Sequence, residues 1–237
     1  MVERVALVVG AAGPLGRATA VSLAGAGFTV VGVDRSEQGL AELADGIRRE
    51  VGDPTDPAAV KSLIDRIATE VGAPEVLVNT IGAFRVGDAL TATPEDLRVM
   101  IDVNVGPALW LSQAVGPYMR ERGSGAIVHV SARPGIEPTA GMAAYSVSKA
   151  ALAHLTRVLD LELRPHGIRV NAVAPLLLDT PRNRAAFPAD LLAHAVRPEA
   201  IAEVIAFLVS DAAAPVSGAL LPRMAHRPPA IPSTCTP

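Results

Sequence analysis

A tyrosine and a lysine stand four residues apart in a segment whose spacing predicts a helix. Tyr145 and Lys149 would therefore lie on one face of that helix, one turn from each other. A phenol has an unperturbed pKa of about 10, and a nearby ammonium lowers that pKa by favouring the phenolate. The pair predicts a proton donor and acceptor that works near neutral pH. Such a pair is common on helix surfaces, so its meaning depends on the rest of the chain.

Three glycines follow the first predicted strand and lead into a helix. They are Gly10, Gly13 and Gly16, in the sequence GAAGPLG. Glycines in such a turn let a pyrophosphate approach the backbone, while the helix N-terminus supplies free N–H groups and the positive end of its dipole. Three glycines alone are weak evidence, because turns of many kinds use glycine. Their position between a first strand and a first helix predicts a dinucleotide-binding site.

An acidic residue ends the second predicted strand. Asp34 stands where a carboxylate accepts hydrogen bonds from the adenosine ribose. The alternative is that Asp34 only caps the next helix. Arg35 could instead hold a 2′-phosphate, but Asp34 would repel that phosphate. The sequence therefore favours NAD(H), with NADP(H) left open as the other cofactor.

Strand-like and helix-like segments alternate around these motifs. Short runs of Val, Ile and Leu are apolar at nearly every position, which is typical of strands buried on both faces of a parallel sheet. The alternation predicts an α/β fold, a single-domain Rossmann-like doubly wound parallel sheet of about seven strands with helices on both faces. The predicted strands are 5–9, 29–33, 76–79, 126–130 and 169–173, with weaker ones at 49–51 and 218–221. The predicted helices are 15–26, 37–49, 57–71, 94–120, 143–164 and 198–210.

Composition narrows the class of protein. The 237 residues contain 21 Lys and Arg against 24 Asp and Glu, so no nucleic acid is expected as a partner. The single cysteine, Cys235, excludes an internal disulfide framework and fits a reducing cytoplasm. His129 and His154 lack metal-ligand spacing, so no metal is expected. The apolar runs are too short to span a membrane, and the N-terminus lacks a signal-peptide pattern, which predicts a cytoplasmic location.

The last residues differ in composition from the rest. Beyond Pro222 the sequence PRMAHRPPAIPSTCTP is rich in proline, which blocks both helix and central strand. We therefore expect a catalytic domain over 1–222 and a Pro-rich tail over 223–237.

Together these features resemble the short-chain dehydrogenase/reductase family, and the resemblance covers about residues 3–221. It implies that Asn104 orders a water of a proton relay and that Lys149 anchors the ribose of the cofactor. The resemblance implies these catalytic residues: Tyr145, Lys149 and Asn104. The cofactor contacts that it implies are Gly10, Gly13, Leu15, Gly16, Asp34, Asp53, Asn79, Gly82, Tyr145, Lys149, Pro175 and Thr180.

The sequence also departs from the family pattern. Pro14 follows Gly13, which changes the glycine spacing, and Leu176 replaces the glycine that usually follows Pro175. The catalytic serine of the family falls on Ala132, which cannot hydrogen-bond a substrate carbonyl. Local similarity to dihydropteridine reductase-like members, which lack that serine, points to a subgroup.

Arginines near the predicted site suggest an anionic or strongly polar substrate. Arg182, Arg184 and Arg197 stand in the segment that covers the substrate in the family, and Arg133 and Arg85 follow strand ends. The substrate contacts that we expect are Ser131, Ala132, Arg133, Arg182 and Arg184.

The function that this pattern predicts is an NAD(P)(H)-dependent oxidoreductase acting on a carbonyl, alcohol or imine-like carbon of a small molecule. The alternatives are a non-redox dehydratase, cyclase or isomerase on the same scaffold and a dinucleotide-binding regulator without turnover. The predicted helices 94–120 and 143–164 are apolar on two sides, which predicts a homodimer or homotetramer unless the tail covers the second side.

Overall fold

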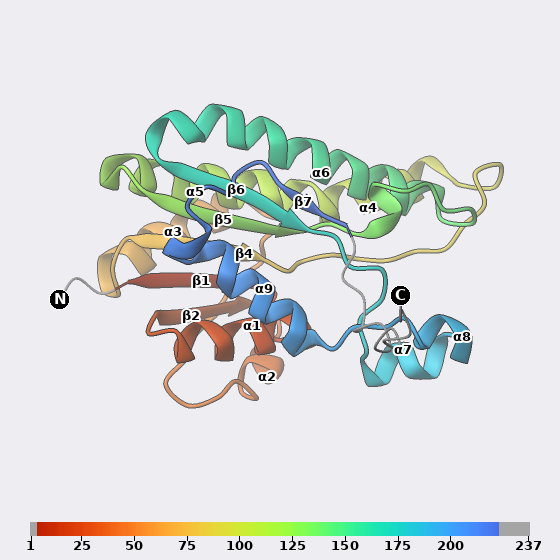
Figure 1. Ribbon diagram of the computed structural model, residues 1–237, viewed down its shortest axis with the longest axis horizontal. Coiled ribbons are helices and arrows are strands. Elements are labelled where there is room, and N and C mark those ends of the chain that lie inside the picture. Colours follow the sequence, from red (N-terminus) through yellow and green to blue (C-terminus); the bar gives the residue numbers. More distant parts are fainter. Residues whose placement is uncertain (1–3, 223–237) are drawn as a thin grey trace, which may run out of the picture.

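The computed structural model describes residues 4–222, which form one parallel sheet in the strand order β3-β2-β1-β4-β5-β6-β7 (Figure 1). Every predicted strand is present, with limits close to those expected, so the predicted fold class is confirmed. The strands are β1 (Val5–Val9), β2 (Thr29–Asp34), β3 (Arg48–Val51), β4 (Pro74–Asn79), β5 (Gly125–Val130), β6 (Ile168–Val173) and β7 (Leu220–Leu221).

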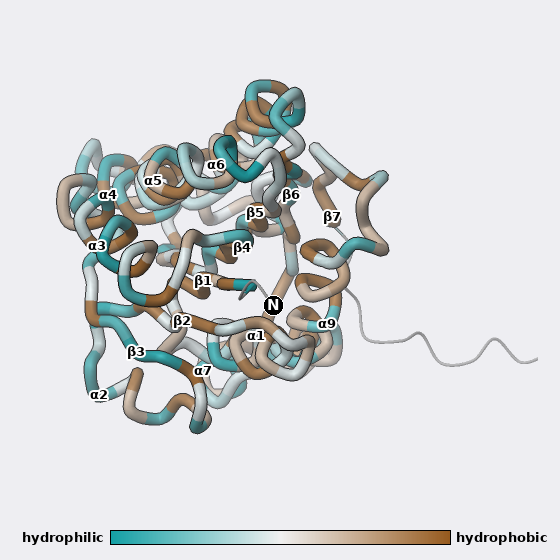
Figure 2. Tube along the Cα trace, turned by 90° about the vertical axis from the view of Figure 1, so that its left-hand side faces the viewer, coloured by the Kyte–Doolittle hydropathy of each residue, from teal (hydrophilic) through white to brown (hydrophobic). Residues whose placement is uncertain are grey.

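Helices cover both faces of the sheet, as Figures 1 and 2 show. One face packs on α1 (Pro14–Gly25), α2 (Glu37–Leu40) and α9 (Pro198–Val209), and the other on α3 (Pro57–Glu70), α5 (Gly106–Arg122) and α6 (Ala143–Leu163). Successive residues of a strand point to opposite faces. Val8 accordingly joins the core under α1 and α9, while Leu7 joins the core under α3 and α5. The alternation explains why these strands are apolar at every position.

The strand order reverses between β1 and β4. From β1 the chain first adds β2 and β3 on one side, and then returns to add β4 through β7 on the other. Connections that leave β1 and β4 in opposite directions open a crevice at the carboxyl edge of the sheet, where ligands of such folds bind. Two short helices, α7 (Pro181–Ala186) and α8 (Ala189–Leu192), lie beyond this edge (Figure 1).

Two predicted helices differ from the structure. The helix expected over 94–120 is divided into α4 (Pro94–Asn104) and α5. Pro107 lacks the N–H that would continue the ladder, and its ring clashes with the carbonyl four residues earlier. The helix expected over 37–49 is limited to α2, because Gly46 has a φ of +83° and the chain from Arg48 pairs with β2 as β3.

The predicted Pro-rich tail, 223–237, lies outside the described residues. Within the described range, none of the helices is both long enough and apolar enough to cross a membrane.

Candidate active site

The connection after β1 forms a tight turn in front of α1. Gly10 has a φ of +86°, a left-handed conformation that favours glycine. A Cβ atom on Gly16 would lie 2.1 Å from the Gly10 carbonyl oxygen, so the turn requires glycine there. Helix α1 begins directly after Gly13, and no side chain among the described residues caps it. The backbone N–H groups of its first turn, at Leu15 and Gly16, therefore fit a dinucleotide pyrophosphate.

Asp34 braces the same turn from the end of β2. Its Oδ2 accepts a hydrogen bond from the backbone N–H of Ala12 at 3.1 Å, and its Oδ1 accepts one from Ser36 at 3.0 Å. The carboxylate is only half-buried, so it keeps an open side. A carboxylate fixed next to the glycine turn is the group that a ribose hydroxyl requires in such folds.

Asp53 lies past the end of β3 and is exposed. Its carboxylate accepts hydrogen bonds from the Thr55 hydroxyl at 2.7 Å and from the Thr55 N–H at 2.9 Å. These hydrogen bonds, with the nearby charge of Arg35, lower the pKa of Asp53. The Arg35 guanidinium therefore lies within electrostatic reach of Asp53.

Tyr145 and Lys149 lie one turn apart on α6, as predicted, but burial changes their titration. Lys149 is 4% exposed, and its Nζ donates a hydrogen bond to the Val130 carbonyl oxygen at 2.9 Å. Burial lowers the pKa of Lys149 to about 8 and raises the pKa of Tyr145 to about 12. The expectation that the ammonium lowers the tyrosine pKa is therefore wrong for the site as it stands, because desolvation dominates.

Asn104 joins α6 to the segment after β4. Its Oδ1 accepts a hydrogen bond from the Ala83 N–H at 2.9 Å, and its Nδ2 donates one to the Ser148 hydroxyl at 2.9 Å. Ser148 in turn donates to the carbonyl oxygen of Tyr145 at 2.8 Å. The sequence analysis missed Ser148. Its signal was a hydroxyl directly before Lys149, on the helix that carries both catalytic candidates.

Gly82 lies between Lys149 and Asn104, and Asn79 turns the chain that leads to it. A Cβ atom on Gly82 would lie 2.9 Å from Lys149 Nζ and 3.1 Å from Asn104 Oδ1, so glycine keeps this space open. Asn79 ends β4 and accepts a hydrogen bond from the Ile81 N–H at 3.0 Å, which turns the chain toward Gly82. Gly82, a predicted cofactor contact, thus lies next to two of the predicted catalytic residues, Lys149 and Asn104.

The residues after β5 show what replaces the usual serine. Ala132 is 3% exposed and supplies only a methyl group. The hydroxyl of its neighbour Ser131 donates to the Lys149 carbonyl oxygen at 2.9 Å, which ties β5 to α6. The N–H of Arg133 bonds the carbonyl oxygen of Pro175 at 3.0 Å, so Pro175 lies beside this segment. The Ser131 hydroxyl is therefore engaged in a hydrogen bond to α6 and does not replace the hydroxyl that is missing at Ala132.

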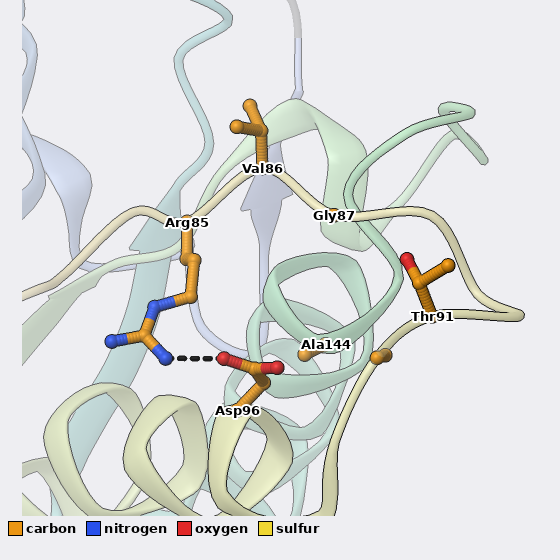
Figure 3. Close-up of a pocket in the computed structure, with 7 residues that line it drawn as sticks. Arg85, Val86, Gly87, Thr91, Asp96 and Ala144 are labelled. Carbon is orange, nitrogen blue, oxygen red and sulfur yellow. Dashed lines mark hydrogen bonds and ion pairs between the residues drawn. The ribbon is translucent and has the colours of Figure 1, made fainter.

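Several of the arginines expected to face an anionic substrate are paired with carboxylates of the protein. Arg182 is exposed on α7. The Thr180 hydroxyl caps the start of this helix by accepting a hydrogen bond from the Asn183 N–H at 3.2 Å. The pairs are Arg133 with Glu137 at 2.7 Å, Arg184 with Asp179 at 2.6 Å, and Arg85 with Asp96 (Figure 3). These contacts weaken the argument for an anionic substrate.

The Arg85–Asp96 pair lies in a small cavity between the loop after β4 and the starts of α4 and α6 (Figure 3). The cavity has a volume of about 190 Å³. Pockets for small-molecule ligands usually measure about 300–1,000 Å³. This cavity is therefore too small to be the main ligand site.

Two phenylalanines that the sequence analysis missed lie at Tyr145, the candidate catalytic tyrosine. The ring of Phe84 packs edge-to-face on the ring of Tyr145, with centroids 4.9 Å apart and planes at 87°. The ring centroid of Phe187 lies 6.1 Å from that of Phe84, and the two ring planes meet at 55°. Each phenylalanine follows a predicted strand, at the edge where ligands bind, and that position was the available signal.

Comparison with known proteins places the chain in a family. The sequence model of the short chain dehydrogenase family matches residues 4–190. The chain therefore belongs to this family, whose members use NAD(H) or NADP(H), and it is an oxidoreductase. The predicted family is confirmed.

Particular relatives match over nearly their whole length. Cis-4-hydroxycyclohexanecarboxylate dehydrogenase of Sinomonas cyclohexanicum is 40% identical, over 92% of this chain and 94% of its own. The 3-oxoacyl-(acyl-carrier-protein) reductase FabG of Thermotoga maritima is 34% identical, over 92% and 95% of the two chains. A crystal structure described as ribose-5-phosphate isomerase from Brucella melitensis has a TM-score of 0.88 at 28% identity, over 94% and 92% of the two chains.

Proposed function

We propose that this protein moves a hydride between a nicotinamide dinucleotide and a carbonyl, alcohol or imine-like carbon of a small molecule, with Tyr145 as the acid/base. The observation that carries the proposal is the meeting of Tyr145, Lys149 and Asn104 at the edge of the sheet where α1 presents its uncapped N-terminus. The dinucleotide, when bound, supplies or accepts the hydride.

The residues of the chain handle the proton. With a pKa of about 12, the Tyr145 hydroxyl stays protonated at neutral pH and can give its proton to a substrate carbonyl oxygen. Lys149, with a pKa of about 8, is mostly charged at neutral pH and stabilises the phenolate that remains. Asn104 positions Tyr145 through Ser148 and holds the backbone at Ala83, next to the path along which a relay water would return the proton.

A substitution at the catalytic tyrosine tests the proposal. Tyr145→Phe removes the proton while keeping the ring, so we expect NADH-dependent reduction of carbonyl compounds to fall by at least about a hundredfold. The measurement is absorbance of the nicotinamide during a carbonyl screen. The matched control is Tyr118→Phe on α5, whose hydroxyl bonds Asp65 away from the site and whose loss should leave the rate unchanged. Full activity of Tyr145→Phe would refute the mechanism.

The preferred cofactor is proposed to be NAD(H). The half-buried Asp34 carboxylate would accept a ribose 2′-hydroxyl and repel a 2′-phosphate. We expect NADH to bind at least about tenfold tighter than NADPH, a difference of about 1.4 kcal/mol. Titration followed by nicotinamide fluorescence measures the two affinities. Asp34→Asn should reduce the preference for NADH, whereas the control Asp102→Asn, on the outside of α4, should leave it unchanged. Tighter NADPH binding by the wild type would mean that Arg35 dominates.

A non-redox reaction remains the second candidate, because Ala132 lacks the hydroxyl that helps to polarise a carbonyl. A dehydratase or isomerase would change the substrate without any net change in nicotinamide absorbance. A regulator would bind the dinucleotide without turnover and would have no use for the catalytic constellation. Product analysis alongside the absorbance assay distinguishes the three.

A further inference from the structure

The chain has few aromatic residues, and they are concentrated at the catalytic tyrosine. Of four Phe, two Tyr and one Trp, the rings of Phe84, Phe187 and Tyr145 form a single cluster. Resting on the proposed function, we propose that Phe84, supported by Phe187, binds the ring of a cyclic substrate, so that this protein acts on ring ketones and ring alcohols in preference to open-chain ones. Below, these two side chains are called the aromatic clamp.

The clamp is built from three separate segments. Phe84 comes from the loop after β4, Tyr145 from the start of α6 after β5, and Phe187 from the junction of α7 and α8 after β6. All three strands end at the carboxyl edge of the sheet, where ligands of open α/β sheets bind. Distant segments converge on one spot, so the cluster marks the substrate side of Tyr145.

Exposed apolar surface adjoins the clamp. The Phe84 side chain is 46% exposed although it touches two other rings, and Val86 and Leu90 on the same loop are 66% and 96% exposed. Apolar side chains gathered on one loop beside a catalytic group are a common mark of a binding surface. The exposed part of the Phe84 ring is therefore an apolar surface that a ligand at Tyr145 could contact.

Two arginines near the clamp are already paired with carboxylates of the protein. Arg85, which follows Phe84, is paired with Asp96, and its side chain points to the opposite side of the loop from Val86 (Figure 3). Arg184, near Phe187, is paired with Asp179 at 2.6 Å. A neutral substrate ring would leave both pairs intact, and the exposed Arg182 on α7 remains as a cation that a charged substrate could meet.

The spacing of the rings limits how a substrate ring can bind. Aromatic pairs prefer centroids about 4.5–7 Å apart, and Phe84 and Phe187 already stand at 6.1 Å. No ring fits between them, so the substrate ring would pack on the exposed side of Phe84, and Phe187 would hold the Phe84 ring in position from its other side. In reduction, the ring carbonyl carbon accepts the hydride of the reduced nicotinamide, and its oxygen accepts the Tyr145 proton. The products are the ring alcohol and the oxidised dinucleotide, and solvent restores the tyrosine proton.

Paired substrates test the clamp. 2-Tetralone, a ring ketone, is compared with 2-decanone, an open-chain ketone with the same number of carbons. We expect kcat/KM with NADH to be about tenfold higher for 2-tetralone. Phe84→Leu should lower the value for 2-tetralone about three- to tenfold, mostly through KM, and should leave 2-decanone within about twofold. Phe84→Trp should retain the preference, and Phe207→Leu, half-exposed on α9, should match the wild type.

Equal preference for the two ketones, or equal losses for both in Phe84→Leu, would overturn the proposal. A binding measurement separates this failure from failure of the proposed function. If no ketone is reduced, calorimetric titration of the protein and its dinucleotide with 2-naphthol still reports on the clamp. Phe84→Leu and Phe187→Leu should each weaken 2-naphthol binding about three- to tenfold. Unchanged affinity in both variants, or no binding by the wild type, counts against the clamp.

Discussion

At the scale of single residues, Ala132 is the position where this chain differs most in its chemistry from the pattern that it otherwise follows. Its methyl group is buried at the end of β5, and the hydroxyl of Ser131 is already bonded to the Lys149 carbonyl oxygen. Neither residue can supply the hydrogen bond that stabilises a developing oxyanion. Tyr145 is therefore the remaining donor that we propose at the reacting oxygen.

Restoring the hydroxyl has a defined expectation. One preorganised donor to a developing oxyanion is commonly worth a few kcal/mol. Ala132→Ser should therefore raise the reduction of simple ketones by roughly tenfold or more, while a substrate that is already electrophilic should change only modestly. Rates with both substrate types, measured in the same preparation, check this expectation. A wild-type protein that reduces simple ketones rapidly and gains nothing from Ala132→Ser would contradict it.

At the scale of elements, a buried histidine links β5 to α5. His129 is fully buried, and its Nε2 lies 3.3 Å from the Ser112 hydroxyl, which itself donates to the Ala108 carbonyl oxygen at 2.7 Å. The serine oxygen can therefore only accept, so Nε2 carries the hydrogen. Nδ1 has no hydrogen-bond partner among the described residues. Burial, and then the charge of Lys149, lower the pKa of His129 to about 4.

This histidine makes stability depend on pH. The unfolded chain takes up a proton below the ordinary pKa of 6.5, whereas the folded protein resists protonation down to about 4. Stability should therefore be complete above pH 6.5 and should fall by up to about 3 kcal/mol as the pH approaches 4. Urea unfolding across this range measures the loss. His129→Asn should flatten the dependence, and the exposed His154→Asn should not; equal slopes in wild type and His129→Asn would disprove the assignment.

At the scale of the whole molecule, the outer side of α4 and α6 exposes apolar side chains. Leu161 and Val147 on α6 are 68% and 53% exposed, and Leu97 on α4 is 43% exposed. The opposite sides of these helices are buried in the core. A helix with two apolar sides requires a second surface to cover the outer one.

We expect a second copy of the chain to cover this surface. Light scattering at micromolar concentration should give at least twice the chain mass of 24.4 kDa. Leu161→Asp should shift the protein toward the monomer, because it places a charge in the covered surface. Val51→Asp on the edge strand β3, where the side chain is 54% exposed, should keep the wild-type mass. A monomeric wild-type protein would rule out the assembly.

The sequence alone determined the features that depend on local order along the chain. Runs apolar at every position predicted the buried parallel strands, because alternate residues of such a strand must both face a core. Glycines between the first strand and helix predicted the turn at Gly10, and the four-residue spacing of Tyr145 and Lys149 put them on one helix face. Each of these features depends only on residues that are close together in the sequence.

Only the tertiary structure decided the features that depend on burial and on contacts between residues distant in the sequence. Burial reversed the expected shift of the Tyr145 pKa, because desolvation depends on all the atoms around a group. The ring of Phe84 packs near that of Phe187, because the segments after β4 and β6 meet at one edge of the sheet. The spacing of residues along the sequence does not show such contacts, because residues far apart in the chain come together only when the strands and helices pack.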